Sequence, residues 1–123
     1  MKAAPEAQRR LLDLQAIDTS LAQLAHRRRS LPELGEIDKE QEFRSSSRAP
    51  LAADLPADLV SLYDKIRAET GLGAALVRSG RCGGCRIELY GADLARVKSA
   101  PADEVVRCEE CRRIMVRTEE SGL

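Results

Sequence analysis

The sequence predicts an α+β fold, in which an N-terminal helical hairpin, the stub of a coiled coil, precedes a small C-terminal β module. Three observations lead to this fold class. Apolar residues recur at helical spacing near the N-terminus, short strand-like runs follow Gly73, and four cysteines stand in two close pairs among those runs. We therefore predict a helical hairpin over 1–53, a linking helix over 54–73 and the β module over 74–123.

The first helix is predicted from Pro5 to about Ser30. Its apolar residues occupy the a and d positions of a heptad, a pattern typical of a short coiled-coil seam: Leu14, Ile17, Leu21 and Leu24. Such a stripe is not stable alone in water and needs a second helix to cover it. Because the returning helix is weak, we predict self-association through residues 5–30.

The return of the hairpin is predicted from its breakers. A turn is expected over 31–35, because Pro32 pushes the residue before it out of helical geometry and Gly35 adds flexibility. A second, weaker helix is expected from Glu36 to about Arg48, where a serine run and Pro50 disfavour a helix.

A third helix is predicted over 57–69. Asp54 or a neighbour is expected to cap its start, and Gly71 to mark its end. Its apolar residues follow the i, i+3, i+4, i+7 spacing of one helix face: Leu59, Leu62, Tyr63 and Ile66.

The elements of the β module are short. We predict four strands and one helical turn: Ala75–Arg78, Arg86–Leu89, Val105–Arg107 and Ile114–Thr118 as strands, and Ala92–Ser99 as the turn. The whole chain holds only three aromatic residues, and a third of its residues are charged. A core this small needs a further stabilising device.

The cysteines provide that device. Cys82 and Cys85 are separated by two residues, Cys108 and Cys111 by two residues, and 22 residues lie between the pairs. Two such knuckles can bring four thiolates to one tetrahedral ion. A site closed by four protein ligands has no position for water, so the predicted metal is a single structural Zn²⁺.

Three other interpretations of the cysteines compete with zinc. A thioredoxin-like redox pair needs one pair and a βαβ context, which is missing, and two disulfides fit a reducing compartment poorly. A rubredoxin-type iron site uses the same four thiolates. Zinc is favoured over iron, although the ligand set alone does not separate the two metals.

Five runs, distributed along most of the chain, support a family resemblance: QRRLLDLQAID at 8–18, AHRRRSLPE at 25–33, LPADLVSLY at 55–63, RCGGCRIEL at 81–89 and DEVVRCEECRRIMVRT at 103–118. On these runs the chain resembles the bacterial C4-type zinc-ribbon proteins that join an N-terminal antiparallel coiled coil to a C-terminal ribbon. The resemblance implies an adaptor role, since members of that family are described as RNA-binding or protein-binding factors.

Two departures from that family stand out. Family members are longer and carry an extended helical hairpin, whereas here the first helix meets the returning helix almost directly near 34–36, through an engineered or a natural deletion. Related ribbons also often place glycine just after the second cysteine of a knuckle, where this chain has Arg86 and Arg112. Those two residues are either right-handed or strained.

Arginines flank both knuckles: Arg81, Arg86, Arg112 and Arg113. They either offset the charge of −2 on a zinc ion with four thiolates or contact a phosphate or a partner protein. Tyr90 is the one aromatic residue of the module, so base stacking is poorly supported.

Composition narrows the function further. The 20 basic and 20 acidic residues give a net charge of zero, so the chain has no strong overall electrostatic field of the kind that indicates binding to nucleic acid or membranes. The absence of a signal peptide or membrane span predicts a cytoplasmic location. No catalytic motif is recognised, so we expect no enzyme. A protein-binding adaptor with an unidentified partner is the first hypothesis, an RNA- or DNA-binding regulatory module the alternative, and a mainly structural or assembly protein the third.

Overall fold

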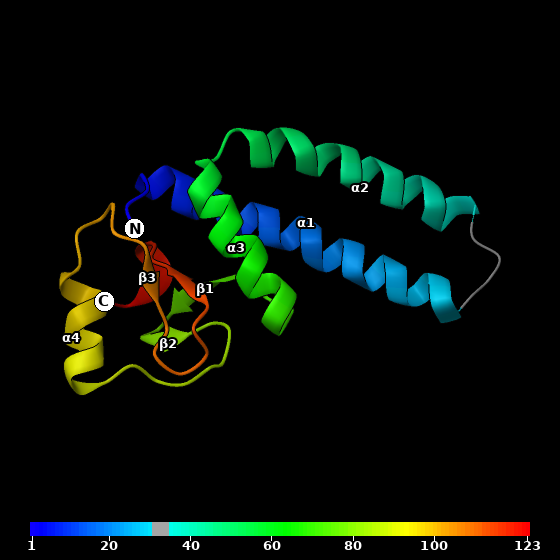
Figure 1. Cartoon of the computed structure of the whole chain (residues 1–123). Coiled ribbons are helices and arrows are strands. Elements are labelled where there is room, and N and C mark those ends of the chain that lie inside the picture. The colour runs from blue at the N-terminus through cyan, green and yellow to red at the C-terminus, as the bar shows by residue number, and fades with distance from the viewer. Residues whose placement is uncertain (31–34) are drawn as a thin grey trace.

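A helical hairpin and a third helix stand beside a small β module (Figure 1). The computed structural model describes the backbone of residues 1–30 and 35–123, and the side chains of 1–27, 39 and 41–123. The described helices of the hairpin are α1 (Pro5–Ser30) and α2 (Gly35–Ala53), which lie side by side and antiparallel. The turn predicted over 31–35 falls on residues 31–34, outside the described residues, and Gly35 already belongs to α2.

The remaining elements follow the predicted order and confirm the α+β class. Helix α3 (Ala57–Thr70) leads to the β module, and Gly71 ends it in a left-handed conformation with φ of 83°. The module contains β1 (Ala74–Arg78), β2 (Arg81–Cys82), α4 (Gly91–Ser99), β3 (Val106–Arg107), β4 (Ile114–Val116) and the 3₁₀ turn η1 (Glu119–Ser121). The strands form one sheet in the order β2-β1-β4-β3, in which β1 and β4 are parallel and the other pairs antiparallel.

The sheet separates two hydrophobic cores, because alternate residues of a strand face opposite sides. In β4, Ile114 and Val116 pack with the helices α1 and α3, whereas Met115 packs with α4 and the knuckles. In β1, Ala74 joins the first core and Val77 the second. The β module is therefore one wall of the helical core as well as a unit of its own.

The buried face of α1 differs from the predicted heptad stripe. Leu14 and Leu24 are buried, but Ile17 and Leu21 are only half-buried. Beside Leu11, which is fully buried, polar residues take the other inward positions: Gln8, Gln15 and Asp18 are at most 5% exposed. Since α1 is partly covered within the chain, the predicted self-association through residues 5–30 stays a prediction, which sedimentation of the intact chain would check.

Two buried glutamines of α1 reach distant parts of the chain. Gln15 Oε1 accepts the backbone N–H of Gly73 at 2.7 Å, at the entry to β1. Gln8 Nε2 donates to the carbonyl oxygens of Ala102 and Glu104 at 3.1 and 3.3 Å. These bonds satisfy groups that would otherwise be buried unpaired, and they fasten α1 to the β module.

The N-terminal residues themselves join the β module. Ala3 N–H donates to Asp103 O at 2.7 Å, and Val105 N–H donates to Met1 O at 3.1 Å, on either side of an antiparallel bridge between Lys2 and Glu104. Met1–Ala3 thus lies against the segment that leads into β3, and the start of α1 is held in place.

A charged network holds the three helices together. The Asp18 carboxylate, 3% exposed, accepts Arg48 Nε at 2.5 Å from α2 and the Tyr63 hydroxyl at 2.7 Å from α3. Arg67 of α3 lies 3.5 Å away, and Arg48 also reaches Asp64 at 3.0 Å. One carboxylate on α1 therefore joins α2 to α3.

The second helix is longer than predicted. It passes Arg48 and includes Pro50, although proline has no N–H for the helix ladder. Tertiary contacts offset that loss: Leu51 and Ala52 pack against the helical core, and Arg48 is fixed by its ion pairs. The prediction of an early end to the helix was wrong because it used local propensity alone.

Two further local predictions were wrong. Pro56 takes the N-cap position of α3 without a side-chain cap, so Asp54 does not cap the helix. The strand predicted over Arg86–Leu89 is absent from the described sheet, because Arg86 has a φ of 64° and turns the chain, leaving one bridge between Arg81 and Glu88. Among the described residues, no helix is long and apolar enough to cross a membrane.

Candidate metal centre

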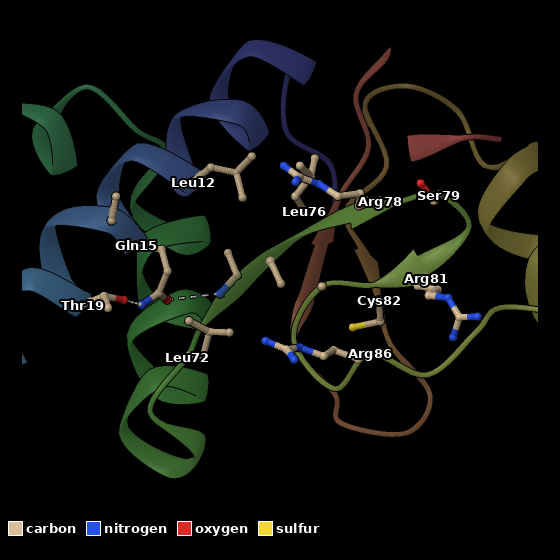
Figure 2. A pocket seen from close by; sticks show the side chains of 14 residues that line it. Leu12, Gln15, Thr19, Leu72, Leu76, Arg78, Ser79, Arg81, Cys82 and Arg86 are labelled. Carbon is tan, nitrogen blue, oxygen red and sulfur yellow. Dashed lines mark hydrogen bonds between the residues drawn. The ribbon is translucent and has the colours of Figure 1, made fainter. Parts of the chain in front are cut away.

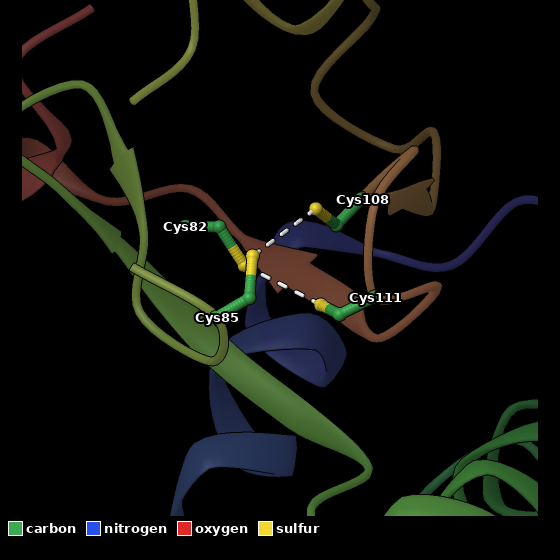
Figure 3. A group of neighbouring side chains, drawn as sticks. All are labelled: Cys82, Cys85, Cys108 and Cys111. Carbon is green, nitrogen blue, oxygen red and sulfur yellow. Dashed lines mark hydrogen bonds between the residues drawn. The ribbon is translucent and has the colours of Figure 1, made fainter. Parts of the chain in front are cut away.

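Two knuckles bring the four cysteine sulfur atoms together. Cys82 ends β2 and Cys85 lies in the turn after it, while Cys108 and Cys111 occupy the turn between β3 and β4 (Figure 3). All four Sγ atoms lie within 4.8 Å of one another. The Sγ atoms of Cys82 and Cys111 are 3.8 Å apart, and those of Cys85 and Cys108 are 3.7 Å apart.

These distances fit one tetrahedral ion. A zinc ion bonded to four sulfurs at ~2.3 Å has sulfur atoms about 3.8 Å apart, the edge of the tetrahedron. Two opposite edges of the cluster already have that length. The donor set is sulfur alone, which suits zinc or iron and excludes magnesium and calcium.

The backbone closes both knuckles in the same way. The N–H of Arg86 donates to Cys82 O at 2.7 Å, and the N–H of Arg112 donates to Cys108 O at 2.9 Å. Both arginines are left-handed, with φ of 64° and 63°. Of the two conformations that the sequence allows, the strained one is therefore adopted, at a cost of about 1–3 kcal/mol each that the surrounding bonds must offset.

Glycine is required in the first knuckle. A Cβ on Gly83 would stand 2.3 Å from the carbonyl oxygen of Leu76, a backbone atom that cannot move away cheaply. A Cβ on Gly84 would meet Cδ of Arg113 at 2.8 Å, the flexible side chain of the other knuckle. The first knuckle therefore packs directly against β1.

The thiols have unequal proton affinities. Burial raises the pKa of Cys82 to about 12, and burial likewise raises the pKa of Cys108. Burial acts against ionisation of Cys111 as well, but the N–H of Arg113 and the neighbouring thiols lower the pKa of Cys111 below its ordinary value. A dication must therefore displace protons from the buried thiols to bind.

The four predicted arginines lie at the knuckles but differ in their contacts. Arg113 is half-buried and donates from Nε to Leu72 O at 3.0 Å, so it ties the second knuckle to the end of α3. Arg81 and Arg112 are exposed, with carboxylates at 3.8 Å. Arg86 is exposed, and within the described residues its guanidinium has no ion pair or hydrogen bond.

Sequence reasoning missed the residues that seat the site. Gln15 and Gly83 position β1 and the first knuckle, but an isolated glutamine and one glycine of a pair carry no distinctive motif. The double glycine between the cysteines is a signal that could have indicated a close approach of backbone to backbone.

Comparison with known proteins identifies the module. Residues 81–115 match the C4-type zinc ribbon domain, a range that contains all four cysteines. This part of the chain is a C4-type zinc ribbon. Residues 33–71 match the CT398-like coiled coil hairpin domain, so the predicted resemblance is confirmed for both parts. With the sulfur geometry, the match gives one structural Zn²⁺ as the cofactor of the ribbon.

Individual proteins are similar to this chain over much of its length. A Mycobacterium tuberculosis protein is 43% identical over 105 residues, which cover 85% of this chain and 43% of that protein. A solved structure from Mycobacterium smegmatis is similar at a TM-score of 0.65 and 40% identity, over 69% of this chain and 36% of that one. CT398 from Chlamydia trachomatis gives 0.59 and 25% identity, over 68% and 35%. The chain thus spans less than half the length of these relatives.

Proposed function

We propose that this chain is a non-catalytic adaptor that binds a protein partner, with the zinc ribbon as its rigid platform. The closed donor set carries the proposal. Four thiolates fill a tetrahedral ion and leave no position for water or a substrate, so the metal stabilises the fold and activates nothing. An ion of this kind contributes of order 10 kcal/mol to folding, enough to order short strands.

Charge favours a protein partner over nucleic acid. The chain has a formal net charge of zero, and the ribbon's arginines are partly engaged. Arg113 donates to two backbone carbonyls, and Arg81 and Arg112 face glutamates. A nucleic-acid surface needs several free cations in a row, because neutralised phosphates supply most of its affinity.

Binding of RNA or DNA is the second candidate function, and one observation favours it. Arg86 is exposed, and its guanidinium has no partner in the part of the chain that the structure describes, so it can bind a phosphate in a bidentate fork. Among the arginines of the ribbon this is a single such contact, and it supports weak binding at most.

The two candidates are separated by zinc dependence, nuclease treatment and salt. The zinc-loaded chain and a Cys111→Ser variant are each used as bait in a pull-down. The protein recovered by the zinc-loaded chain is then purified for titration. We expect the zinc-loaded chain to bind it after nuclease treatment, with an affinity that changes little with salt, and the variant to lose it. Binding that disappears with nuclease, or whose log K falls by about 0.7 per phosphate contact against log salt, would establish the nucleic-acid function instead.

A further inference from the structure

One face of α1 borders a long open groove. Between α1 and the first knuckle it has a volume of about 1030 Å³ and is lined from the helix by Leu12, Ala16 and Thr19 (Figure 2). A second hollow of about 560 Å³ continues it along α1 as far as Arg27. The two hollows share Thr19, and together they form the α1 groove.

The helix residues that line the α1 groove form one stripe. Their positions recur at intervals of three and four residues, the spacing of a single helix face: 12, 15, 16, 19, 22, 23, 26 and 27. At 1.5 Å per residue the stripe is about 21 Å long, or about four helical turns. Ala16, Thr19 and Ala22 are small, so they leave room for the side chains of a second helix.

The floor of the groove is apolar. Leu12 of α1, Leu72 at the end of α3 and Leu76 of β1 are half-buried and line it. Tyr63 and Phe43 lie elsewhere in the helices, and no Phe, Tyr or Trp is among the described lining residues, so His26 is the one aromatic ring among them. A surface of this kind suits aliphatic side chains better than a row of stacked bases, which needs several aromatic rings.

The rim of the groove is basic. No Asp or Glu is among the described residues that line either hollow, although the chain has 20 of them, whereas Arg27, Arg78 and Arg86 are. Figure 2 shows the side chains of Arg78 and Arg86 reaching toward α1. Arg27 and Arg86 have no ion pair or hydrogen bond through their guanidinium groups within the described residues. Arg78 pairs with Glu120 at 3.3 Å, an exposed contact that a partner's carboxylate can replace.

We propose that the α1 groove binds an acidic, amphipathic helix of the partner protein; this inference rests on the adaptor function proposed above. Aliphatic residues at i, i+3 or i+4 and i+7 of the bound helix pack on Leu12, Leu72 and Leu76. Its carboxylates meet Arg86 at the knuckle end and Arg27 at the far end. A length of about 14 residues covers the stripe.

A display library of random 16-residue peptides, selected on the intact zinc-loaded chain, tests the proposal without a known partner. We expect the selected peptides to combine Asp or Glu with Leu, Ile or Val at helical spacing. Synthetic peptides from the selection are then titrated against the variants. Arg27→Gln with Arg86→Gln should weaken binding about tenfold. Lys65→Gln, an exposed cation of α3 outside the lining, is the matched control and should change nothing.

A second pair of variants tests the shape of the groove. Ala16→Trp fills it from an exposed helix position, and Ala68→Trp places the same side chain on an exposed face of α3 that does not line it. Only the first should abolish peptide binding, with helix content and zinc content unchanged in both. The proposal is refuted if the selected peptides show no excess of Asp and Glu. It is also refuted if they bind Ala16→Trp and Ala68→Trp equally well.

The outcome also separates this inference from the adaptor function. A purified partner that binds the chain but ignores Ala16→Trp leaves the adaptor intact and refutes the groove. If the double variant Arg27→Gln with Arg86→Gln loses binding of single-stranded RNA but keeps binding of the selected peptides, the groove binds nucleic acid and both proposals are wrong.

Discussion

The most discriminating test of the fold is the removal of the Asp18 carboxylate. Its oxygens accept Arg48 Nε at 2.5 Å and the Tyr63 hydroxyl at 2.7 Å, and Arg67 Nε stands 3.5 Å away. Asp18→Ala removes the acceptor of Arg48 Nε and of the Tyr63 hydroxyl and one ion-pair partner of Arg67. Inside the junction of three helices, the two guanidinium groups then keep only Asp64. Burial and the bond to Asp18 raise the pKa of Tyr63, so the hydroxyl remains a donor throughout the pH range of the assay.

The magnitude follows from the exposure of the partners. Breaking a fully buried ion pair costs about 3–5 kcal/mol, because the remaining charge is left uncompensated. Here the side chains of Arg48 and Arg67 are 24% and 39% exposed, so water recovers part of that loss. We expect Asp18→Ala to lower the free energy of unfolding by about 2–4 kcal/mol. Tyr63→Phe, which removes one bond to a charged acceptor, should lower it by about 1.5 kcal/mol.

The assay is urea unfolding followed by far-UV circular dichroism, with excess zinc so that metal binding is constant. Asp13→Ala, an exposed carboxylate on the same helix, is the matched control and should change the free energy of unfolding by less than about 0.5 kcal/mol. An Asp18→Ala variant within about 0.5 kcal/mol of that control would refute the reasoning, since the network would then contribute no net stability.

Three other predictions concern the ribbon. A chelator should unfold the strands of the ribbon. Zinc binding at neutral pH should release protons, and its affinity should rise with pH, because the buried Cys82 thiol, with a pKa of about 12, must lose its proton. The absorbance of a pH indicator during zinc titration measures the release. Gly83→Ala should destabilise by about 2 kcal/mol or more and weaken zinc retention, since its Cβ would lie 2.3 Å from a β1 carbonyl oxygen; Gly84→Ala, which meets a flexible side chain, should do so much less. Arg113→Ala should cost about 1–2 kcal/mol of thermal stability through its lost bonds to the end of α3, whereas exposed Arg112→Ala should cost almost nothing.

The metal centre and the main helices could be predicted because their signals are local or periodic. Two residues between cysteines already place both thiolates on one ion, and the second pair completes it. Leu59, Tyr63 and Ile66 are buried on one face of α3, as their spacing indicates. Such patterns need no knowledge of the rest of the chain.

The buried polar residues of α1 could not be predicted from the same patterns. A heptad interpretation places Gln15 and Asp18 outside the seam, because it treats polar side chains as exposed. Both are buried, because their hydrogen-bond partners are distant in the sequence: Gly73 is 58 residues from Gln15, and Tyr63 is 45 residues from Asp18. The wrong strand over Arg86–Leu89 has a similar cause, because a left-handed arginine is allowed only by the knuckle that surrounds it.

The metal site and the α1 groove share residues, which gives the zinc ion a consequence beyond the fold of the ribbon. Cys82, Gly83 and Arg86 all line the groove, so the first knuckle is one of its walls. That wall is held against β1 by the approach of Gly83 to Leu76, and the opposite wall, α1, is held by Gln15 at the entry to β1. Loss of zinc removes the first wall, whereas α1 keeps the Asp18 network that joins it to α2 and α3 without the sheet. Peptide binding should therefore depend on zinc even where the circular dichroism of the helices does not.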